Sequence, residues 1–292
     1  MDTSRRAFFK GVATAATLSV IPAVAEAREK IVPRADAVGL LYDTTRCVGC
    51  KACTVACKKA NDLPADTDGY GDGLYDSPEG LNEYTKTVIQ LAKSDNETSF
   101  VKKQCMHCVD PACVGACMLG AMYKGDFGIV SYDASKCVGC RYCEVACPFG
   151  VPKFEWSKKA PKIVKCELCR TRLAKGQKPA CTDVCPRDAV IYGTRAELLQ
   201  DARQRIAANP GKYVQKIYGE NELGGTQVLY LSHVPFEDLG FRFSETESVP
   251  HVQQSVQHGI YKGFAAPVAL YALLGAVMFR NRRQEKEEKN DE

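Results

Sequence analysis

The feature that most constrains this chain is a run of four cysteines at residues 137–148, CVGCRYCEVACP, with gaps of two, two and three residues and a closing proline. Three thiolates this close together on one loop are able to bind three irons of a single [4Fe–4S] core, while the fourth cysteine reaches a neighbouring core. Because its fourth ligand serves another cluster, such a run needs a second run beside it. The sequence therefore predicts at least one pair of cluster-binding units.

All 16 cysteines fall into four blocks of this kind. In chain order the blocks are Cys47, Cys50, Cys53 and Cys57; Cys105, Cys108, Cys113 and Cys117; Cys137, Cys140, Cys143 and Cys147; and Cys166, Cys169, Cys181 and Cys185. The first and third blocks form an internal repeat, since residues 42–57 align without gaps on residues 132–147. The second and fourth blocks resemble each other more loosely. Repeated ligand blocks predict repeated cluster-binding units, but the spacing leaves open which block partners which.

The spacing favours iron–sulfur clusters over disulfides and zinc. Sixteen cysteines in a short secreted chain would indicate a disulfide framework, but this chain has 292 residues and its cysteines lie in ligand-like blocks. A structural zinc site uses two separated Cys/His pairs, and none of the 4 histidines stands at a ligand position. His107, between two cysteines of the second block, is interpreted as a loop histidine bonded to the backbone, with a hydrogen bond to a cluster sulfur as the alternative.

The net charge of +4 is small and is explained by basic residues that offset the negative charge of thiolate-bound clusters. No basic stripe or stacking platform accompanies it, so nucleic-acid binding is not predicted.

Both ends of the chain carry patterns that predict its location. Residues 1–27 combine paired arginines, Arg5 and Arg6, with a short apolar middle and a small-residue end, which is typical of a twin-arginine signal peptide. Residues 259–279 are mostly apolar and predict one transmembrane helix. Arginines open the charged tail of residues 280–292, so the positive-inside rule predicts a cytoplasmic C-terminus. We expect export by the twin-arginine route and anchoring on the periplasmic face of the inner membrane.

The segments between the blocks predict few further elements. Residues 40–42 read as a short strand before the first block, and residues 61–100, rich in Asp and Gly, as a long surface insertion that is either a solvated loop or a partner contact. Thr194 and Glu197 have the spacing of a capping box that opens a helix ending near Asn209. Residues 226–232 read as a strand. We therefore divide the chain into a cluster domain at 28–195 and a peripheral C-terminal extension at 196–258.

The chain resembles the four-cluster ferredoxin-like subunits that conduct electrons in respiratory complexes, and among them the iron–sulfur subunits of hydrogenase-2-type membrane-bound [NiFe] hydrogenases. The resemblance rests on LLYDTTRCVGCKAC, KKQCMHCVDPACV, CVGCRYCEVACPFGVPKF, KCELC, AVIYGTR and GGTQVLYL. It implies an α+β fold of two intertwined double-cluster units and a chain that is not an enzyme by itself. The implied partners are the small and large [NiFe] hydrogenase subunits and a multi-helix membrane subunit that reduces quinone.

The resemblance also implies how the blocks share four [4Fe–4S] clusters. The implied ligand sets are Cys47, Cys50, Cys53 with Cys185; Cys166, Cys169, Cys181 with Cys57; Cys105, Cys108, Cys113 with Cys147; and Cys137, Cys140, Cys143 with Cys117. Two alternatives stay open. One keeps the same electron-transfer subunit in a formate dehydrogenase or molybdenum-enzyme complex, and the other is a metal-binding scaffold that only tethers a partner to the membrane.

Overall fold

The computed structural model describes residues 29–65, 78–93 and 97–288, and the signal-peptide prediction for residues 1–27 lies outside them. The chain divides into a body, Lys30–Pro250, and a second unit that contains the C-terminal helix. The strands are β1 (Val38–Asp43), β2 (Val88–Lys93), β3 (Thr98–Lys103), β4 (Met122–Lys124), β5 (Val130–Tyr132), β6 (Lys153–Phe154), β7 (Ile163–Val164), β8 (Val190–Thr194) and β9 (Val228–Leu231). The helices are α2 (Ala52–Ala60), α3 (Ala112–Gly115), α4 (Tyr142–Val145), α5 (Arg170–Leu173), α6 (Ala180–Asp183), α7 (Arg195–Ala208) and α8 (Val249–Glu288), with 3₁₀ turns at Asp126–Gly128, Ala134–Lys136 and Glu222–Gly224.

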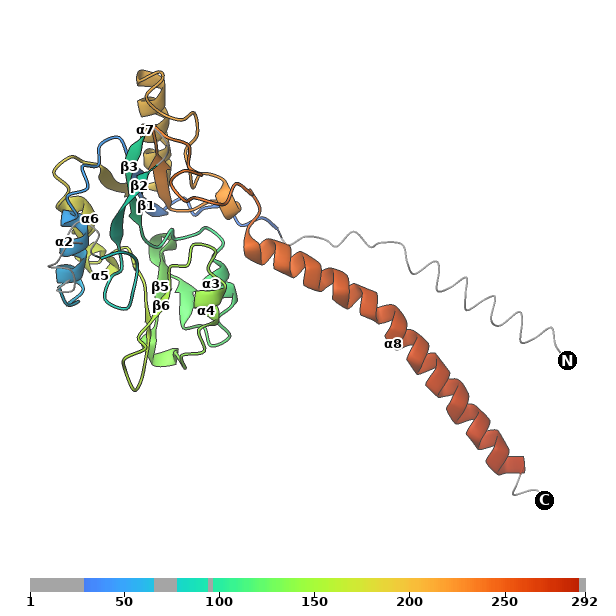
Figure 1. Ribbon diagram of the computed structural model, residues 1–292. Helices are drawn as coiled ribbons and strands as arrows, with labels where there is room; N and C mark the ends of the chain where they lie inside the picture. The colour runs from blue at the N-terminus through green and yellow to red at the C-terminus, as the bar shows by residue number, and fades with distance from the viewer. Residues whose placement is uncertain (1–28, 66–77, 94–96, 289–292) are drawn as a thin grey trace. The chain divides into compact units, whose positions relative to one another are not determined.

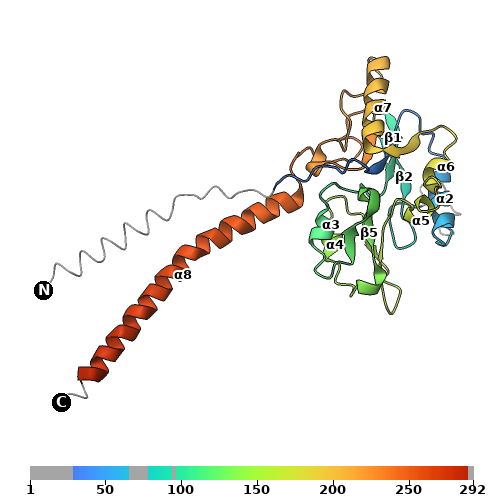
Figure 2. The same ribbon diagram turned by 180° about the vertical axis from the view of Figure 1, so that it is seen from behind.

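The body contains two copies of one small α/β arrangement. In the first copy, β1 leads into the first cysteine block and pairs antiparallel with β8, which follows the fourth block. In the second copy, β5 leads into the third block and pairs antiparallel with β4, which follows the second block. The helices follow the same pairing, since α2 contacts α6 and α3 contacts α4, and both views show each pair side by side (Figures 1 and 2).

The two copies share the same strand register. Tyr42 lies opposite Val190 in the first copy, and Tyr132 lies opposite Met122 in the second. Each tyrosine stands five residues before the first cysteine of its block, and each partner stands five residues after the last cysteine of the other block. The fold therefore couples the first block to the fourth and the second to the third, which the spacing alone left open.

The prediction of a surface loop over residues 61–100 is wrong for its second half. β2 and the first half of β3 lie there, and the two strands form a hairpin in which Val88, Ile89 and Val101 are buried. The hairpin is fastened to the sheet by two tyrosine hydroxyls, because Tyr42 donates to the carbonyl oxygen of Phe100 and Tyr230 to that of Lys102. Asp and Gly in the first part of the segment concealed these apolar residues, and neither VIQLAK nor TSFVKK has the strict alternation of apolar and polar residues that indicates a strand.

The prediction that residues 196–258 are peripheral is also wrong. β9 completes the main sheet by pairing parallel with β1, and all four of its residues are buried. The same region supplies an aromatic cluster in which Tyr218, Tyr230, Phe236 and Phe241 pack with ring centroids 4.4 to 6.4 Å apart. Each such side chain contributes about 1.5–3 kcal/mol when fully buried, so the C-terminal region is part of the core.

The helix predicted at the C-terminal end is present as α8, which contains Pro267. Within the part of the chain that the structure describes, however, no helix is both long and apolar enough to cross a membrane. The membrane span predicted for residues 259–279 is therefore not supported.

Candidate metal centres

The first and third blocks fold into the same loop. Gly49 and Gly139 adopt positive φ angles of 69° and 74°, a region that glycine enters without steric cost. Their amides donate to the sulfurs of Cys47 and Cys137, each over 3.4 Å. At Gly49 a Cβ atom would lie 2.3 Å from the ring of Phe100, so the turn is also closed against the hairpin. This tight turn directs the cysteines of each block toward one point.

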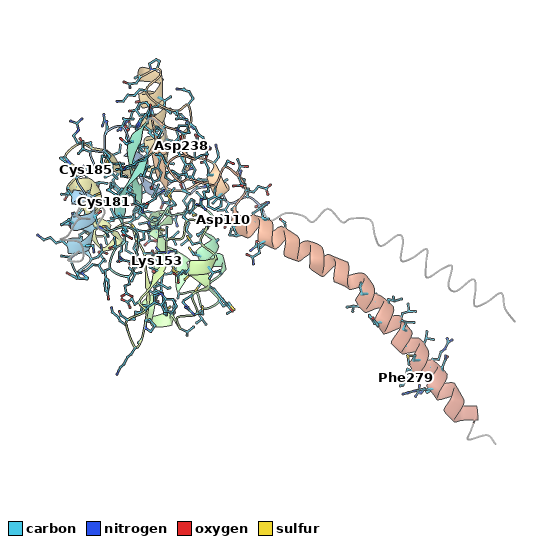
Figure 3. All side chains as sticks on the ribbon, viewed as in Figure 1. Asp110, Lys153, Cys181, Cys185, Asp238 and Phe279 are labelled. Carbon is cyan, nitrogen blue, oxygen red and sulfur yellow. The ribbon has the colours of Figure 1, made fainter. Side chains whose placement is uncertain are left out.

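The second and fourth blocks share a different loop. In both, a proline precedes a short helix whose second residue is the third cysteine, with Pro111 before Cys113 and Pro179 before Cys181. Proline suits this position because it has no amide hydrogen to leave unpaired. Both cysteines are buried. Figure 3 shows Cys181 and Cys185 at α6, next to α2 of the first block.

The structure brings the thiols together in four groups, each drawn from two blocks. Thiol group A is Cys47, Cys50, Cys53 and Cys185; group B is Cys166, Cys169, Cys181 and Cys57; group C is Cys105, Cys108, Cys113 and Cys147; and group D is Cys137, Cys140, Cys143 and Cys117. These four sets are the ones that the family resemblance implies.

Group A lines a cavity. Its four cysteines surround one pocket together with Tyr42 and Ile89. Burial raises the pKa of the Cys53 thiol, and the neighbouring thiols of Cys47 and Cys185 raise it further.

Group B takes its fourth thiol from the first block. Burial raises the pKa of the Cys57 thiol, and the nearby thiol of Cys166 raises this pKa further. Burial likewise raises the pKa of Cys181 to about 12, with Cys166 and Cys169 beside it.

Groups C and D show the same exchange between the second and third blocks. Burial raises the pKa of Cys113 to about 12, and the thiols of Cys105 and Cys147 act in the same direction. In group D, burial raises the pKa of Cys143 to about 11, and among the neighbouring thiols Cys117 raises this pKa the most.

The four groups follow one another in a single order. Cys53 of group A is a neighbour of Cys181 of group B. Cys166 of group B is a neighbour of Cys105 of group C, and Cys113 of group C is a neighbour of Cys143 of group D. The order is therefore A, B, C, D. The two exposed cysteines, Cys50 and Cys140, belong to the end groups A and D.

The donor set fits iron–sulfur clusters. The raised pKa values would keep the buried thiols protonated, whereas iron binds thiolates, so bound iron would supply the positive charge that stabilises the thiolates in the interior. Among the described residues, no three His, Cys, Asp or Glu side chains converge on a point suited to a single metal ion. A [4Fe–4S] core holds its four thiolates apart, because each binds a different iron.

Two buried lysines and one half-buried lysine near the thiol groups were not identified from the sequence. Lys102 and Lys165 are buried, and the amine of Lys124 donates to the carbonyl oxygen of Cys108 over 2.7 Å. Burial lowers the pKa of Lys124 to about 8, although the neighbouring thiols oppose that shift. The sequence offered one indication of these buried lysines, namely that Lys102 and Lys165 stand just before a cysteine block. Surface lysines occur at such positions too, so this position alone does not predict burial.

His107 is bonded to the backbone, as its first interpretation requires. Its Nδ1 accepts the amide hydrogen of Val130 over 3.1 Å. Burial, reinforced by Lys165 and Lys124, holds the pKa of this imidazole well below its usual value. The ring is therefore neutral, and because Nδ1 accepts, the hydrogen sits on Nε2. Within the described part of the chain, Nε2 is buried and has no hydrogen-bond partner.

The chain is similar to a known protein family and to several individual iron–sulfur proteins. A family model described as a 4Fe-4S dicluster domain matches residues 96–195. The chain is 38% identical to hydrogenase-2 operon protein HybA of Shigella flexneri, over 99% of both chains. It is 36% identical to the nitrate-inducible formate dehydrogenase iron-sulfur subunit of Escherichia coli, over 80% of this chain and 79% of that one. It is also 33% identical to the formate dehydrogenase iron-sulfur subunit of Haemophilus influenzae, over 82% and 78% respectively.

Proposed function

Because the chain belongs to the family of iron–sulfur electron-transfer subunits found in hydrogenase and formate dehydrogenase complexes, we propose that it conducts electrons from a [NiFe] hydrogenase heterodimer to a membrane subunit that reduces quinone. The chain itself catalyses no reaction in this proposal. Its partners are the small and large hydrogenase subunits on one side and a multi-helix membrane subunit on the other.

In this proposal the sixteen cysteines hold four [4Fe–4S] clusters, one in each of thiol groups A to D. Each cluster, when bound, takes up and releases one electron at a time. The chain's own residues hold the groups in a fixed order, donate amide hydrogens to the cysteine sulfurs and leave the cysteines of the inner groups less exposed than Cys50 and Cys140. Electrons enter and leave at the ends of the row, where Cys50 and Cys140 are exposed.

We place the protein on the periplasmic face of the cytoplasmic membrane. The twin-arginine pattern at residues 1–27 supports this location, because that route exports proteins that have already folded. Export after folding suits a chain whose thiols must receive iron before they meet an oxidising compartment.

One observation carries the choice of hydrogenase as the electron source. The match to the hydrogenase-2 operon protein covers 99% of both chains, whereas the two formate dehydrogenase subunits match about four fifths of this one. The additional similarity therefore lies partly in regions outside the cysteine blocks that the whole family shares.

The proposal is tested by purifying the tagged full-length chain from its native membranes in mild detergent and assaying hydrogen-dependent and formate-dependent dye reduction on the same fraction. We expect hydrogen-dependent activity to co-purify. In a Cys50→Ala variant, hydrogen-to-quinone electron flow should stop while hydrogen-to-dye activity at the catalytic subunits persists. Unchanged quinone reduction in that variant would contradict the proposal.

The second candidate is the same electron-transfer role in a formate dehydrogenase complex. It is supported by the 36% identity to a formate dehydrogenase subunit over 80% of this chain. Formate-dependent activity in the purified fraction, without hydrogen-dependent activity, is the result that favours it.

A further inference from the structure

Lys102 and Lys165 are buried inside the body without an acidic partner. Lys102 is 0% exposed, and its amine donates to the hydroxyl of Thr87 over 2.6 Å and to the side-chain oxygen of Gln104. Lys165 is 3% exposed, and its amine donates to the carbonyl oxygens of Val130 and Cys166. All four acceptors are neutral, and within residues 29–65, 78–93 and 97–288 no carboxylate forms an ion pair with either amine. A buried ammonium group without an anion is strongly unfavourable, so each requires negative charge nearby.

The thiol groups are the source of that charge around Lys102. Its β3 position lies opposite Ile89 of β2, and Ile89 lines the cavity of group A. Burial is the largest single influence and lowers the pKa of Lys102, but the surrounding thiols together raise it by more, with Cys181 and Cys53 first among them. Cys181 belongs to group B and Cys53 to group A. Lys102 therefore lies between the first two groups of the row.

Lys165 occupies the next gap in the same row. It directly precedes Cys166 of group B, and its amine turns back to bond the carbonyl oxygen of that residue over 2.9 Å. Its charge also acts on the thiols of Cys105 and Cys113, both in group C. One buried lysine thus lies between groups A and B, and another between groups B and C.

We propose that Lys102 and Lys165 are positioning residues whose positive charges raise the reduction potentials of the clusters held by the inner groups B and C. The inference rests on the proposed function, since it takes the thiol groups to hold clusters. Reduction adds a negative charge to a cluster, and the low-dielectric interior penalises that charge unless a cation is close. The end groups A and D each have an exposed cysteine, so that water reaches them. In the inner groups each cysteine is half-buried or buried, so water reaches them less and the lysines supply the positive charge.

The functional consequence concerns the reduction potentials of the inner clusters relative to those of the end clusters. Without the lysines, groups B and C would accept an electron less readily than A and D, and the middle of the row would become a barrier. With them, the protein keeps buried clusters reducible without exposing them to water.

The test is a redox titration, monitored by electron paramagnetic resonance, of the full-length chain purified in its complex. Lys102→Met and Lys165→Met each remove one buried charge, and Lys136→Met is the matched control. Lys136 is next to Cys137 of group D, but its side chain is 60% exposed and lies 3.7 Å from Asp133.

We expect Lys102→Met to lower one or two of the four potentials, and Lys165→Met to lower a different set that includes the cluster of group C. Each shift should correspond to at least a tenfold weaker reduction equilibrium, which is about 59 mV for one electron. Lys136→Met should leave all four potentials in place.

If Lys102→Met binds less iron than the wild type, Lys102→Gln replaces it, since an amide still donates to Thr87 and Gln104 while the charge is absent. Unchanged or raised potentials in the charge-free variants, with iron and sulfide content intact, would overturn the inference and leave the proposed function standing. A wild-type chain without four reducible clusters would overturn both.

Discussion

At the residue scale, the last cysteine of each block serves a different group from the three cysteines before it. Cys57 belongs to the first block in sequence, but its thiol lies among those of Cys166, Cys169 and Cys181. The sequence repeat identified all sixteen cysteines as ligands. The spacing also predicted that each fourth cysteine serves a neighbouring cluster, but it left open which block supplies that cluster, because for Cys57 the partner thiols are more than a hundred residues away and only the folded sheet brings them close.

The exchange predicts which cluster a single substitution disturbs. Replacing Cys57 with serine should alter the same paramagnetic signal as Cys181→Ser, because both remove a thiolate of group B. The signal altered by Cys53→Ser should be a different one. An altered signal that Cys57→Ser shares with Cys53→Ser, and not with Cys181→Ser, would show that the first block binds its own four-cysteine cluster.

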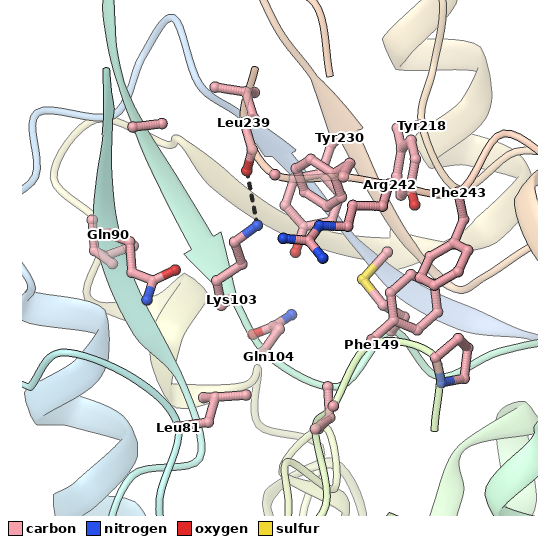
Figure 4. Close-up of a pocket in the computed structure, with 18 of the residues that line it drawn as sticks. Leu81, Gln90, Lys103, Gln104, Phe149, Tyr218, Tyr230, Leu239, Arg242 and Phe243 are labelled. Atoms are coloured by element: carbon pink, nitrogen blue, oxygen red, sulfur yellow. Dashed lines mark hydrogen bonds between the residues drawn. The ribbon is translucent and has the colours of Figure 1, made fainter. Parts of the chain in front are cut away.

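Lys103 is a second residue whose environment affects a measurable property, the pH dependence of folding stability. Its amine donates to the carbonyl oxygen of Leu239 over 2.9 Å and lies 4.2 Å from the centre of the Phe241 ring, in the pocket drawn in Figure 4. Burial lowers the pKa of this amine to about 8, whereas an unfolded lysine titrates near 10.4. Between these two pH values the unfolded chain binds more protons, so this group makes the folded state more stable as pH rises.

Lys103→Met should remove that dependence. Relative to the wild type, the variant should have its largest gain in thermal unfolding midpoint below about pH 8, where both states of the wild type are charged. The gain should shrink between about pH 8 and 10. Midpoints measured across this range on the full-length chain are the check, and parallel curves for the two proteins would contradict the assignment.

At the element scale, the parts that the sequence predicted are those with local signals. The strand predicted at residues 40–42 lies within β1, β9 lies within the strand predicted at 226–232, and the helix predicted after Thr194 is α7. The capping box of α7 has both of its hydrogen bonds, between the Thr194 hydroxyl and the Glu197 amide and between the Glu197 carboxylate and the Thr194 amide. Capping depends on residues three positions apart, so a single sequence contains the whole signal.

The capping box sets the stability of α7. Thr194→Ala leaves the first turn without its side-chain acceptor and should destabilise the body by about 1 kcal/mol. Gln200→Ala, at an exposed position of the same helix, is the control and should change stability by no more than about 0.5 kcal/mol. Denaturant unfolding of both variants measures the difference, and equal stabilities would show that the cap contributes nothing.

The elements that the sequence missed depend on contacts between distant residues. The β2–β3 hairpin was read as a loop because Asp and Gly dominate the first part of its segment, and the core role of residues 196–250 follows from the pairing of β9 with β1. Lys102 was likewise overlooked, because a lysine in a strand is normally exposed. The thiols that lie beside this lysine, which is 0% exposed, come from the first and fourth cysteine blocks and are distant from it in sequence.

At the scale of the whole molecule, two copies of one arrangement are joined so that four thiol groups form a row. The internal repeat predicted the copies, and the shared register of Tyr42 with Val190 and of Tyr132 with Met122 shows how each copy combines two blocks. The order A, B, C, D was not available from the sequence, since it depends on how the copies meet at Cys105 and Cys166. A row with one exposed cysteine at each end is suited to accept electrons from one partner and deliver them to another.

The most direct test of this account is to measure iron and acid-labile sulfide in the purified full-length chain, together with zinc. Four [4Fe–4S] clusters require about sixteen iron atoms and about sixteen sulfides per chain, with no stoichiometric zinc, and this is the result we predict. Four zinc ions per chain without sulfide, or iron and sulfide near eight, would contradict the claim that each of the four thiol groups holds one cluster.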